Sequence, residues 1–323
     1  MRAGELLVVA VALCANCIAS VRAGADDFPF IAIRSMGSGA TNPKFTETIF
    51  AANEKYPGLV DEIWFGGCSP YVTGSLDEAL VKPQLKYRAE CEKRGIRFSL
   101  QQGPTLGYDG QHSAPPGLDI PDTAWAMTPD GKRHPGVFCP TSPEARAFNL
   151  KGAKAVIGGL KPYSYWPDDD LRLSKRGNRI CFCDRCVAAF NRRSGRNLTR
   201  AQLETALYGK PGDKNVRADW IAHNCRVLAD FASVYREAAD AVSPETRVGQ
   251  QAPDAAWAPE GDDARAARLP FVKQICYEAE NWPHVGALKN PGGMMSECAY
   301  MLAVGCDSIA FYWGAAINGE SDA

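Results

Sequence analysis

The chain has 323 residues, and its 36 Lys and Arg residues against 37 Asp and Glu residues give a formal net charge of -1. This balance provides no broad electrostatic attraction for nucleic acid or an anionic membrane, so neither is an expected partner. The length suits two average domains or one barrel of alternating strands and helices. A neutral, polar substrate fits the charge best.

The N-terminus has the pattern of a secretory signal peptide. Arg2 precedes an apolar run over residues 6–19, and the small residues Val21 and Ala23 beside Arg22 resemble a signal-peptide cleavage site. The apolar run is shorter than the roughly 20 residues that span a bilayer. We therefore expect a signal peptide at 1–23, a periplasmic or secreted protein without an integral membrane segment after signal removal, and one domain over 24–323. An N-terminal core helix is the alternative.

Short apolar or β-branched runs alternate with helical patterns, which indicates strand-helix units around a parallel sheet. Seven strands are predicted, at 28–33, 60–65, 97–101, 163–166, 247–251, 272–277 and 308–313. A full barrel needs an eighth unit, and the Ala-, Pro- and Gly-rich stretch 254–269 is where a shortened or degenerate one would fit. The fold class is thus α/β, a (β/α)8 barrel of TIM type. The sequence leaves open a truncation at its C-terminal end.

Helix start signals support this reading. Ser142 precedes Pro143, a combination typical of a helix N-terminus, and Thr199 caps a helix predicted at 200–207. The longest predicted helix covers 220–241 and is amphipathic. The stretch 103–140 is rich in Pro and Gly and is predicted to be a long loop, which in compact folds is commonly functional.

Four cysteines have the spacing of metal ligands. Cys181, Cys183 and Cys186 form a C-x-C-x2-C pattern, and Cys139 lies upstream. Four thiolates suit a tetrahedral zinc ion in a closed, structural site that pins two loops together. Buried unpaired thiols or disulfides are the alternatives, and for the other cysteines after the signal peptide we expect buried single thiols.

Acidic residues follow two of the predicted strands. The run Asp168, Asp169 and Asp170 comes after strand 163–166, and Glu278 comes after strand 272–277. The carboxyl ends of parallel barrel strands form the active face, and glycoside cleavage needs one carboxylic acid and one ionised carboxylate. Three adjacent carboxylates repel one another when ionised, so we expect the pKa of at least one of these aspartates to be raised. A solvated loop or a calcium site is the alternative.

Neighbouring residues complete the candidate site. Glu280 is a second acid or the alternative nucleophile, and Arg172 is an ion-pair partner for the aspartates. Aromatic faces pack on the C-H groups of sugars. The predicted substrate-binding residues are Asp168, Arg172, Glu280, Asn281, Trp166 and Trp313.

Several separated motifs resemble family 42 glycoside hydrolases, the β-galactosidase-like retaining enzymes with (β/α)8 barrels. They are Gly-Val-Phe-Cys-Pro-Thr-Ser-Pro at 136–143, Cys-Phe-Cys-Asp-Arg-Cys at 181–186, Tyr-Glu at 277–278 and the last strand at 305–313. The resemblance spans roughly residues 28 to 314 of the chain. It implies a zinc site at Cys139, Cys181, Cys183 and Cys186.

The resemblance also implies catalytic roles: Glu278 as the nucleophile, Asp170 at the position of the acid/base glutamate, and Asp169 at that of an asparagine. Aspartate is one carbon shorter than glutamate. The shorter side chain increases the separation of the two carboxylates unless the backbone compensates. That separation, ~5 to 5.5 Å for retention and ~6.5 to 9.5 Å for inversion, decides the stereochemistry.

The leading hypothesis is a glycoside hydrolase that cleaves β-linked sugars, with an oligosaccharide or glycoside as substrate. The alternative is a noncatalytic carbohydrate-binding barrel, which the aspartate replacement and the missing strand unit favour. A zinc-knuckle nucleic-acid module has only the cysteine spacing in its support, and the neutral charge opposes it. The sequence leaves a homo-oligomer open.

Overall fold

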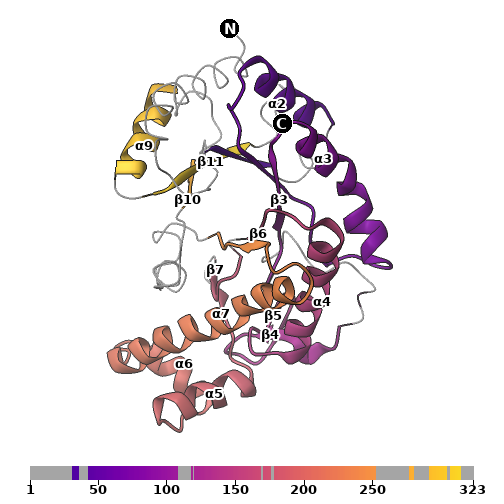
Figure 1. Cartoon of the computed structure of the whole chain (residues 1–323). Helices are drawn as coiled ribbons and strands as arrows, with labels where there is room; N and C mark the ends of the chain where they lie inside the picture. The colour runs from indigo at the N-terminus through magenta and orange to yellow at the C-terminus, as the bar shows by residue number, and fades with distance from the viewer. Residues whose placement is uncertain are drawn as a thin grey trace, which may run out of the picture. The chain divides into compact units, whose positions relative to one another are not determined.

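The computed structural model describes residues 31–35, 43–107, 118, 120–168, 170–175, 178–251, 276–279, 291–303 and 306–313 (Figure 1). The chain divides into two compact units. The first unit comprises 1–67, 86–101 and 271–323, and the second comprises 68–85 and 102–270. The predicted signal peptide and the stretch 254–269 lie outside the described residues.

Each of the seven predicted strands is confirmed in the sheet. The strands are β1 (Ile31–Ser35), β2 (Glu62–Phe65), β3 (Arg97–Gln102), β6 (Ser164–Pro167), β9 (Arg247–Val248), β10 (Cys276–Ala279) and β11 (Ser308–Trp313), in the order β10-β11-β1-β2-β3-β6-β9. The pairs β1–β11, β1–β2, β10–β11, β2–β3 and β6–β9 are all parallel. The predicted parts 28–30 and 272–275 lie outside the described residues.

Strand side chains in the first unit alternate between two faces, as the period of a strand requires. On one face Ile63, Phe65 and Leu100 are fully buried, and Phe65 stacks on Tyr87 with ring centroids 5.3 Å apart. Tyr87 belongs to α3 (Lys82–Lys93), which follows the π-helical turn η2 (Asp77–Val81). The unit also contains α2 (Pro43–Lys55) and α9 (Pro291–Ala303). The opposite face of the strands carries polar side chains.

In the second unit, α4 (Pro143–Leu160) and α7 (Lys214–Val242) pack side by side (Figure 1). The predicted caps are confirmed: Ser142 accepts from the amide of Ala145, and Thr199 forms a capping box at α6 (Arg200–Tyr208). Helix α7 begins six residues before the predicted 220. Asp213 is the N-cap residue of this helix, and its side chain accepts from two amides of the first turn, which explains the earlier start.

The prediction of a long loop over 103–140 was wrong for its second half. This half contains a 3-10 turn, η3 (Asp122–Ala124), and a hairpin of β4 (Trp125–Met127) and β5 (Arg133–Phe138). Trp125 stacks on Phe138 across the hairpin, with ring centroids 4.8 Å apart. Pro135 and Gly136 within β5 obscure the strand pattern in the sequence.

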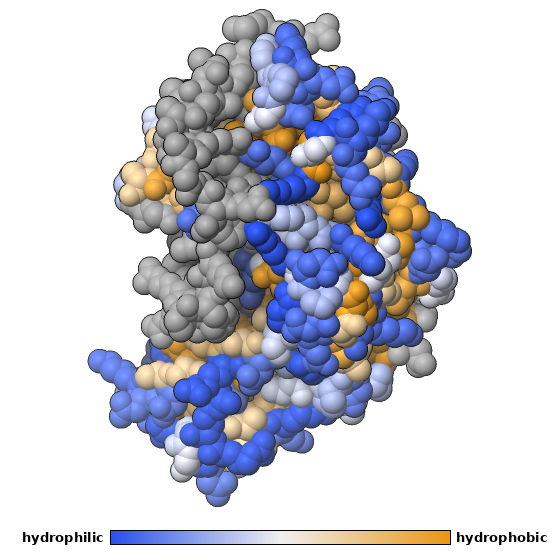
Figure 2. All heavy atoms as spheres, in the orientation of Figure 1, coloured by the Kyte–Doolittle hydropathy of each residue, from blue (hydrophilic) through white to orange (hydrophobic). Residues whose placement is uncertain are grey.

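The remaining elements of the second unit are α5 (Asp184–Ser194) and a small hairpin of β7 (Ser174–Lys175) and β8 (Asn178–Arg179). The face shown in Figure 2 is mostly hydrophilic, with small apolar patches. Among the helices of the described residues, none combines the length and apolar composition needed to cross a bilayer.

Candidate functional site

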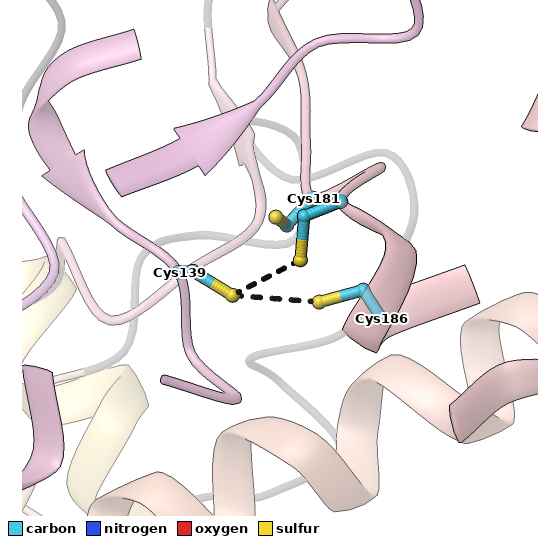
Figure 3. Close-up of side chains that lie close together, drawn as sticks. Cys139, Cys181 and Cys186 are labelled. Atoms are coloured by element: carbon cyan, nitrogen blue, oxygen red, sulfur yellow. Dashed lines mark hydrogen bonds between the residues drawn. The ribbon is translucent and has the colours of Figure 1, made fainter. Parts of the chain in front are cut away.

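The four predicted metal ligands come together. The Sγ atoms of Cys139, Cys181, Cys183 and Cys186 all lie within 4.8 Å of one another, and all four residues are buried. Figure 3 shows the labelled side chains pointing toward one another. The Sγ of Cys139 lies 3.6 Å from that of Cys183 and 3.5 Å from that of Cys186.

These distances fit a zinc ion. A tetrahedral site with Zn–S bonds of about 2.3 Å places its sulfur atoms about 3.8 Å apart, which is close to the spacing observed here. Four thiolates would fill all coordination positions, so such an ion would brace the structure without activating water. The cluster could therefore hold a metal ion of structural type.

Local structure explains how the ligands converge. Cys139 directly follows β5, while Cys183 occupies the N-cap position of α5 and Cys186 lies in the first turn of that helix. The backbone links the two segments, because the amide of Phe182 donates to the carbonyl of Met127 in β4 at 2.7 Å. The four cysteines thus join the hairpin to the start of α5.

Polar groups around the thiols suit thiolate ligands. The hydroxyl of Thr141 lies 3.2 Å from the Sγ of Cys139 and 3.1 Å from that of Cys186, and the amide of Met127 donates to Cys181 at 3.4 Å. Hydrogen bonds from Cys139 and the other cluster thiols hold the pKa of Cys183 far below its ordinary value. Such donors around a metal site orient its ligands. Sequence reasoning missed Thr141.

The other described cysteines do not form disulfides with one another. Cys68, Cys91 and Cys298 are buried, in line with the expectation of single thiols, whereas Cys225, Cys276 and Cys306 are only partly buried. Burial raises the pKa of Cys68 to about 12. That thiol therefore remains protonated at neutral pH and is a poor nucleophile.

Asp170 lies in a cage of hydrogen-bond donors within the second unit. Its carboxylate accepts from the amide of Thr105 at 2.7 Å, from the Thr105 hydroxyl at 2.5 Å and from the amide of Gly107 at 2.7 Å. The residue is only 1% exposed. Asp170 therefore anchors the segment that follows β3, a role that the sequence did not suggest.

Asp168 lies beside this cage at the end of β6. Its amide donates to the carbonyl of Gln102, and a Cβ on Gly103 would come within 2.8 Å of its Oδ2. Burial and, after it, the neighbouring charge of Asp168 raise the pKa of Asp170 to about 7, against the opposing effect of the donors. The two carboxyl groups therefore titrate as a pair.

A buried polar network supports the end of β3 in the second unit. The side-chain amide of Gln102 donates to the side-chain oxygen of Asn149 at 2.8 Å, and the hydroxyl of Tyr235 donates to that oxygen at 3.1 Å. Tyr165 donates to the side-chain oxygen of Gln102. All four residues are fully buried, so these bonds fix the positions of β3, β6, α4 and α7 around the aspartates.

Glu278 lies in the first unit, within β10 and on the polar face of the strands. Its carboxylate forms an ion pair with Arg34 of β1, and the Nε of Arg34 donates to the side-chain oxygen of Gln101 in β3 at 2.7 Å. Arg34 is buried, while the Glu278 side chain is 22% exposed. An arginine in this position favours an ionised carboxylate, the form that a nucleophile requires.

The ion pair of Arg34 and Glu278 should make a measurable contribution to the free energy of unfolding. Replacing Arg34 with methionine removes the cation beside Glu278, and we expect the free energy of unfolding to fall by about 2 kcal/mol, less than for a fully buried pair because Glu278 is partly exposed. Urea unfolding of Arg34→Met, Glu278→Gln and the double variant forms a double-mutant cycle. Additive effects of the two substitutions would contradict a coupled pair.

The remaining site predictions are untested. Arg172 is half-buried, and its amide donates to the carbonyl of Asp170. The indole N–H of Trp166 donates to Ser164 at 2.7 Å, and its ring packs so closely on Gly249 that a Cβ there would clash. Asp169, Glu280, Asn281 and the side chain of Trp313 lie outside the described residues, although Trp313 does end β11 as predicted.

Similarity to known proteins was found among solved structures. No protein-family profile matches the sequence, and no curated protein matches it significantly. The PgaB (BpsB) glycoside hydrolase domain from Bordetella bronchiseptica is 11% identical over 91% of this chain and 96% of that chain, with a TM-score of 0.58. The catalytic domain of β-amylase from Paenibacillus polymyxa is 12% identical over 89% and 92%, with a TM-score of 0.55.

A third similar structure is α-L-fucosidase isoenzyme 2 from Paenibacillus thiaminolyticus, 14% identical over 91% of this chain and 47% of the fucosidase, with a TM-score of 0.54. All three neighbours are glycoside hydrolases by description. At these identities the likeness establishes the fold, and it confirms the predicted α/β class with a TIM-type (β/α)8 architecture.

Proposed function

We propose that this protein is a glycoside hydrolase. The observation that carries the proposal is the ion pair of Glu278 with Arg34 on the polar face of a parallel sheet, in a fold whose structural neighbours are glycoside hydrolases. Barrel enzymes bind their substrates at the carboxyl ends of the strands, and Glu278 is the last residue but one of β10. Carbohydrate is therefore the substrate class that we assign.

In this proposal Glu278, in the first unit, has the role of the nucleophile that attacks the anomeric carbon, as the resemblance to family 42 implies. The pair of Asp168 and Asp170, in the second unit, has the role of the proton donor to the leaving oxygen. We assign the proton donor to the pair and not to Asp170 alone, because Thr105 and Gly107 already donate hydrogen bonds to both carboxylate oxygens of Asp170. The two carboxyl groups share one proton, because the charge of Asp168 raises the pKa of Asp170. In a retaining mechanism the deprotonated pair then activates the water that releases the sugar.

The pH dependence of activity follows from the raised pKa of Asp170. With a pKa of about 7, the aspartate pair holds a proton below pH 7 and loses it above. We expect kcat/KM to be constant more than about one pH unit below pH 7, to halve near pH 7, and to fall about tenfold per pH unit more than about one unit above it. A pH–rate profile from pH 5 to 9 measures this, and activity that rises steadily to pH 9 would exclude the pair as proton donor.

The narrower activity that we propose is cleavage of β-linked sugars with retention, in line with the resemblance to family 42. A panel of aryl α- and β-glycosides, followed by NMR of the first-formed anomer, tests the linkage and the stereochemistry together. Saturable glycan binding without turnover across the panel would favour the alternative, a noncatalytic carbohydrate-binding barrel. Release of the α-anomer from a β-glycoside would indicate inversion.

Two further assignments belong to this proposal. The four-cysteine cluster holds structural zinc, which the sulfur spacing supports. Residues 1–23 direct export, which the charge and apolar run of that segment support. The mass of the protein recovered from a periplasmic extract would show whether residues 1–23 have been removed, and an intact N-terminus would contradict export by cleavage.

A further inference from the structure

A single three-residue segment, 105–107, lies between the cysteine cluster and Asp170. The backbone amides of its first and last residues, Thr105 and Gly107, donate hydrogen bonds to the Asp170 carboxylate. Its middle residue, Leu106, accepts from the amide of Phe138 at 2.7 Å. Phe138 directly precedes Cys139. One hydrogen bond and one peptide bond therefore separate a metal ligand from the segment that holds the aspartate.

This segment has no room to shift independently of the hairpin. Gly107 has φ +108°, a conformation that favours glycine, and a Cβ there would lie 1.9 Å from the carbonyl oxygen of Gly136. Leu106 and Phe138 are both fully buried. Because the two backbones touch, displacement of the residues before Cys139 has to move the donors of Asp170.

We propose that metal binding at the cysteine cluster and the hydrogen-bond cage of Asp170 are energetically coupled. The bound metal fixes Cys139 and with it residues 136–138, and these hold Thr105 and Gly107 where their amides reach Asp170. This inference depends on the proposal that the cysteine cluster binds zinc, and it does not depend on the proposal that the protein hydrolyses glycosides. It is reciprocal by thermodynamic linkage, so that loss of the Asp170 carboxylate weakens metal binding.

The first test measures zinc affinity by competition with a chromophoric chelator. In the full chain, Asp170→Asn replaces one carboxylate oxygen with an amide group that cannot accept from these donors, and we expect zinc affinity to fall by about fivefold or more. Thr105→Val removes only the hydroxyl donor and should shift the affinity less, in the same direction. The matched control is Asp240→Asn, an exposed aspartate on α7 in the same unit, which should leave the affinity unchanged.

The second test uses the unmodified protein and avoids any folding defect of the variants. Hydrogen exchange of peptides covering 104–107 should become at least about tenfold faster after zinc is removed by chelation, while α2 in the first unit should not change. If zinc binds stoichiometrically but neither affinity nor exchange responds, the coupling is overturned and the zinc site stands. If the protein binds no zinc, both proposals are overturned.

Discussion

Replacing Glu278 with glutamine should lower kcat on an aryl β-glycoside by a thousandfold or more, which is on the order of what one positioned catalytic group contributes. Glutamine keeps the shape of glutamate but cannot form the covalent glycosyl intermediate. The measurement is the steady-state rate of aryl alcohol release. Urea unfolding of the same sample shows whether the variant is folded.

The matched control is Glu62→Gln. Glu62 is a buried glutamate on the same face of the sheet, and it accepts a hydrogen bond from the hydroxyl of Ser99. This substitution should change stability without a comparable loss of kcat. If Glu62→Gln and Glu278→Gln lose activity equally, the loss reflects packing of the strands and not the chemistry of Glu278.

Azide separates a nucleophile from a proton donor. In Glu278→Ala, azide can enter the space of the lost carboxylate and attack the anomeric carbon, so we expect it to restore product formation from an activated β-glycoside as the α-glycosyl azide. In Asp168→Asn, azide acts in the second step and should give the β-azide. The opposite pattern of anomers would exchange the roles of the two residues. If azide restores activity in neither variant, the covalent mechanism is contradicted.

Replacing Cys183 with serine should abolish stoichiometric zinc. Four thiolates surround the site, and apparent binding energies of structural zinc in small domains are about 10–16 kcal/mol, so the loss of one ligand removes a large stabilising contribution. We expect about one zinc per chain in the parent protein and almost none in Cys183→Ser. Elemental analysis after dialysis measures this directly.

The structural consequence of zinc loss should be local. The hairpin of β4 and β5 and the start of α5 meet at the cysteines, so limited proteolysis should cut near 127–139 and 181–186 in Cys183→Ser and in the chelated parent protein. The control is Cys225→Ser, a partly buried cysteine of α7 that is not in the cluster. Full zinc content in Cys183→Ser would contradict the assigned ligand set.

Much of the fold was accessible from the sequence because its signals are local. Most of the seven strands are short runs in which apolar residues predominate, and the caps at Ser142 and Thr199 depend on residues within one helical turn. The C-x-C-x2-C pattern is equally local, since three of the four thiols lie within six residues of one another. Cys139 was predicted as the upstream fourth ligand, a set that the resemblance also implies, and the structure brings it to the other three.

Hydrogen bonds between distant parts of the chain were not accessible in this way. The cage of Asp170 uses backbone amides some 65 residues away in the chain, and a backbone amide has no signature in the sequence. The partner of Glu278 is 244 residues away, and only the parallel register of β10, β11 and β1 brings Arg34 beside it. Arg34 and Gln101 could have been suspected only as polar residues within otherwise apolar strands.

The sequence by itself determined the alternation of strands and helices and the residue types available for chemistry, because composition and short-range spacing act through the nearest neighbours of each residue. Only the tertiary structure decided what surrounds each carboxylate. The burial of Asp170, the charge of Asp168 beside it and the arginine next to Glu278 are properties of the space around these groups, and pKa values and ion pairs depend on that space.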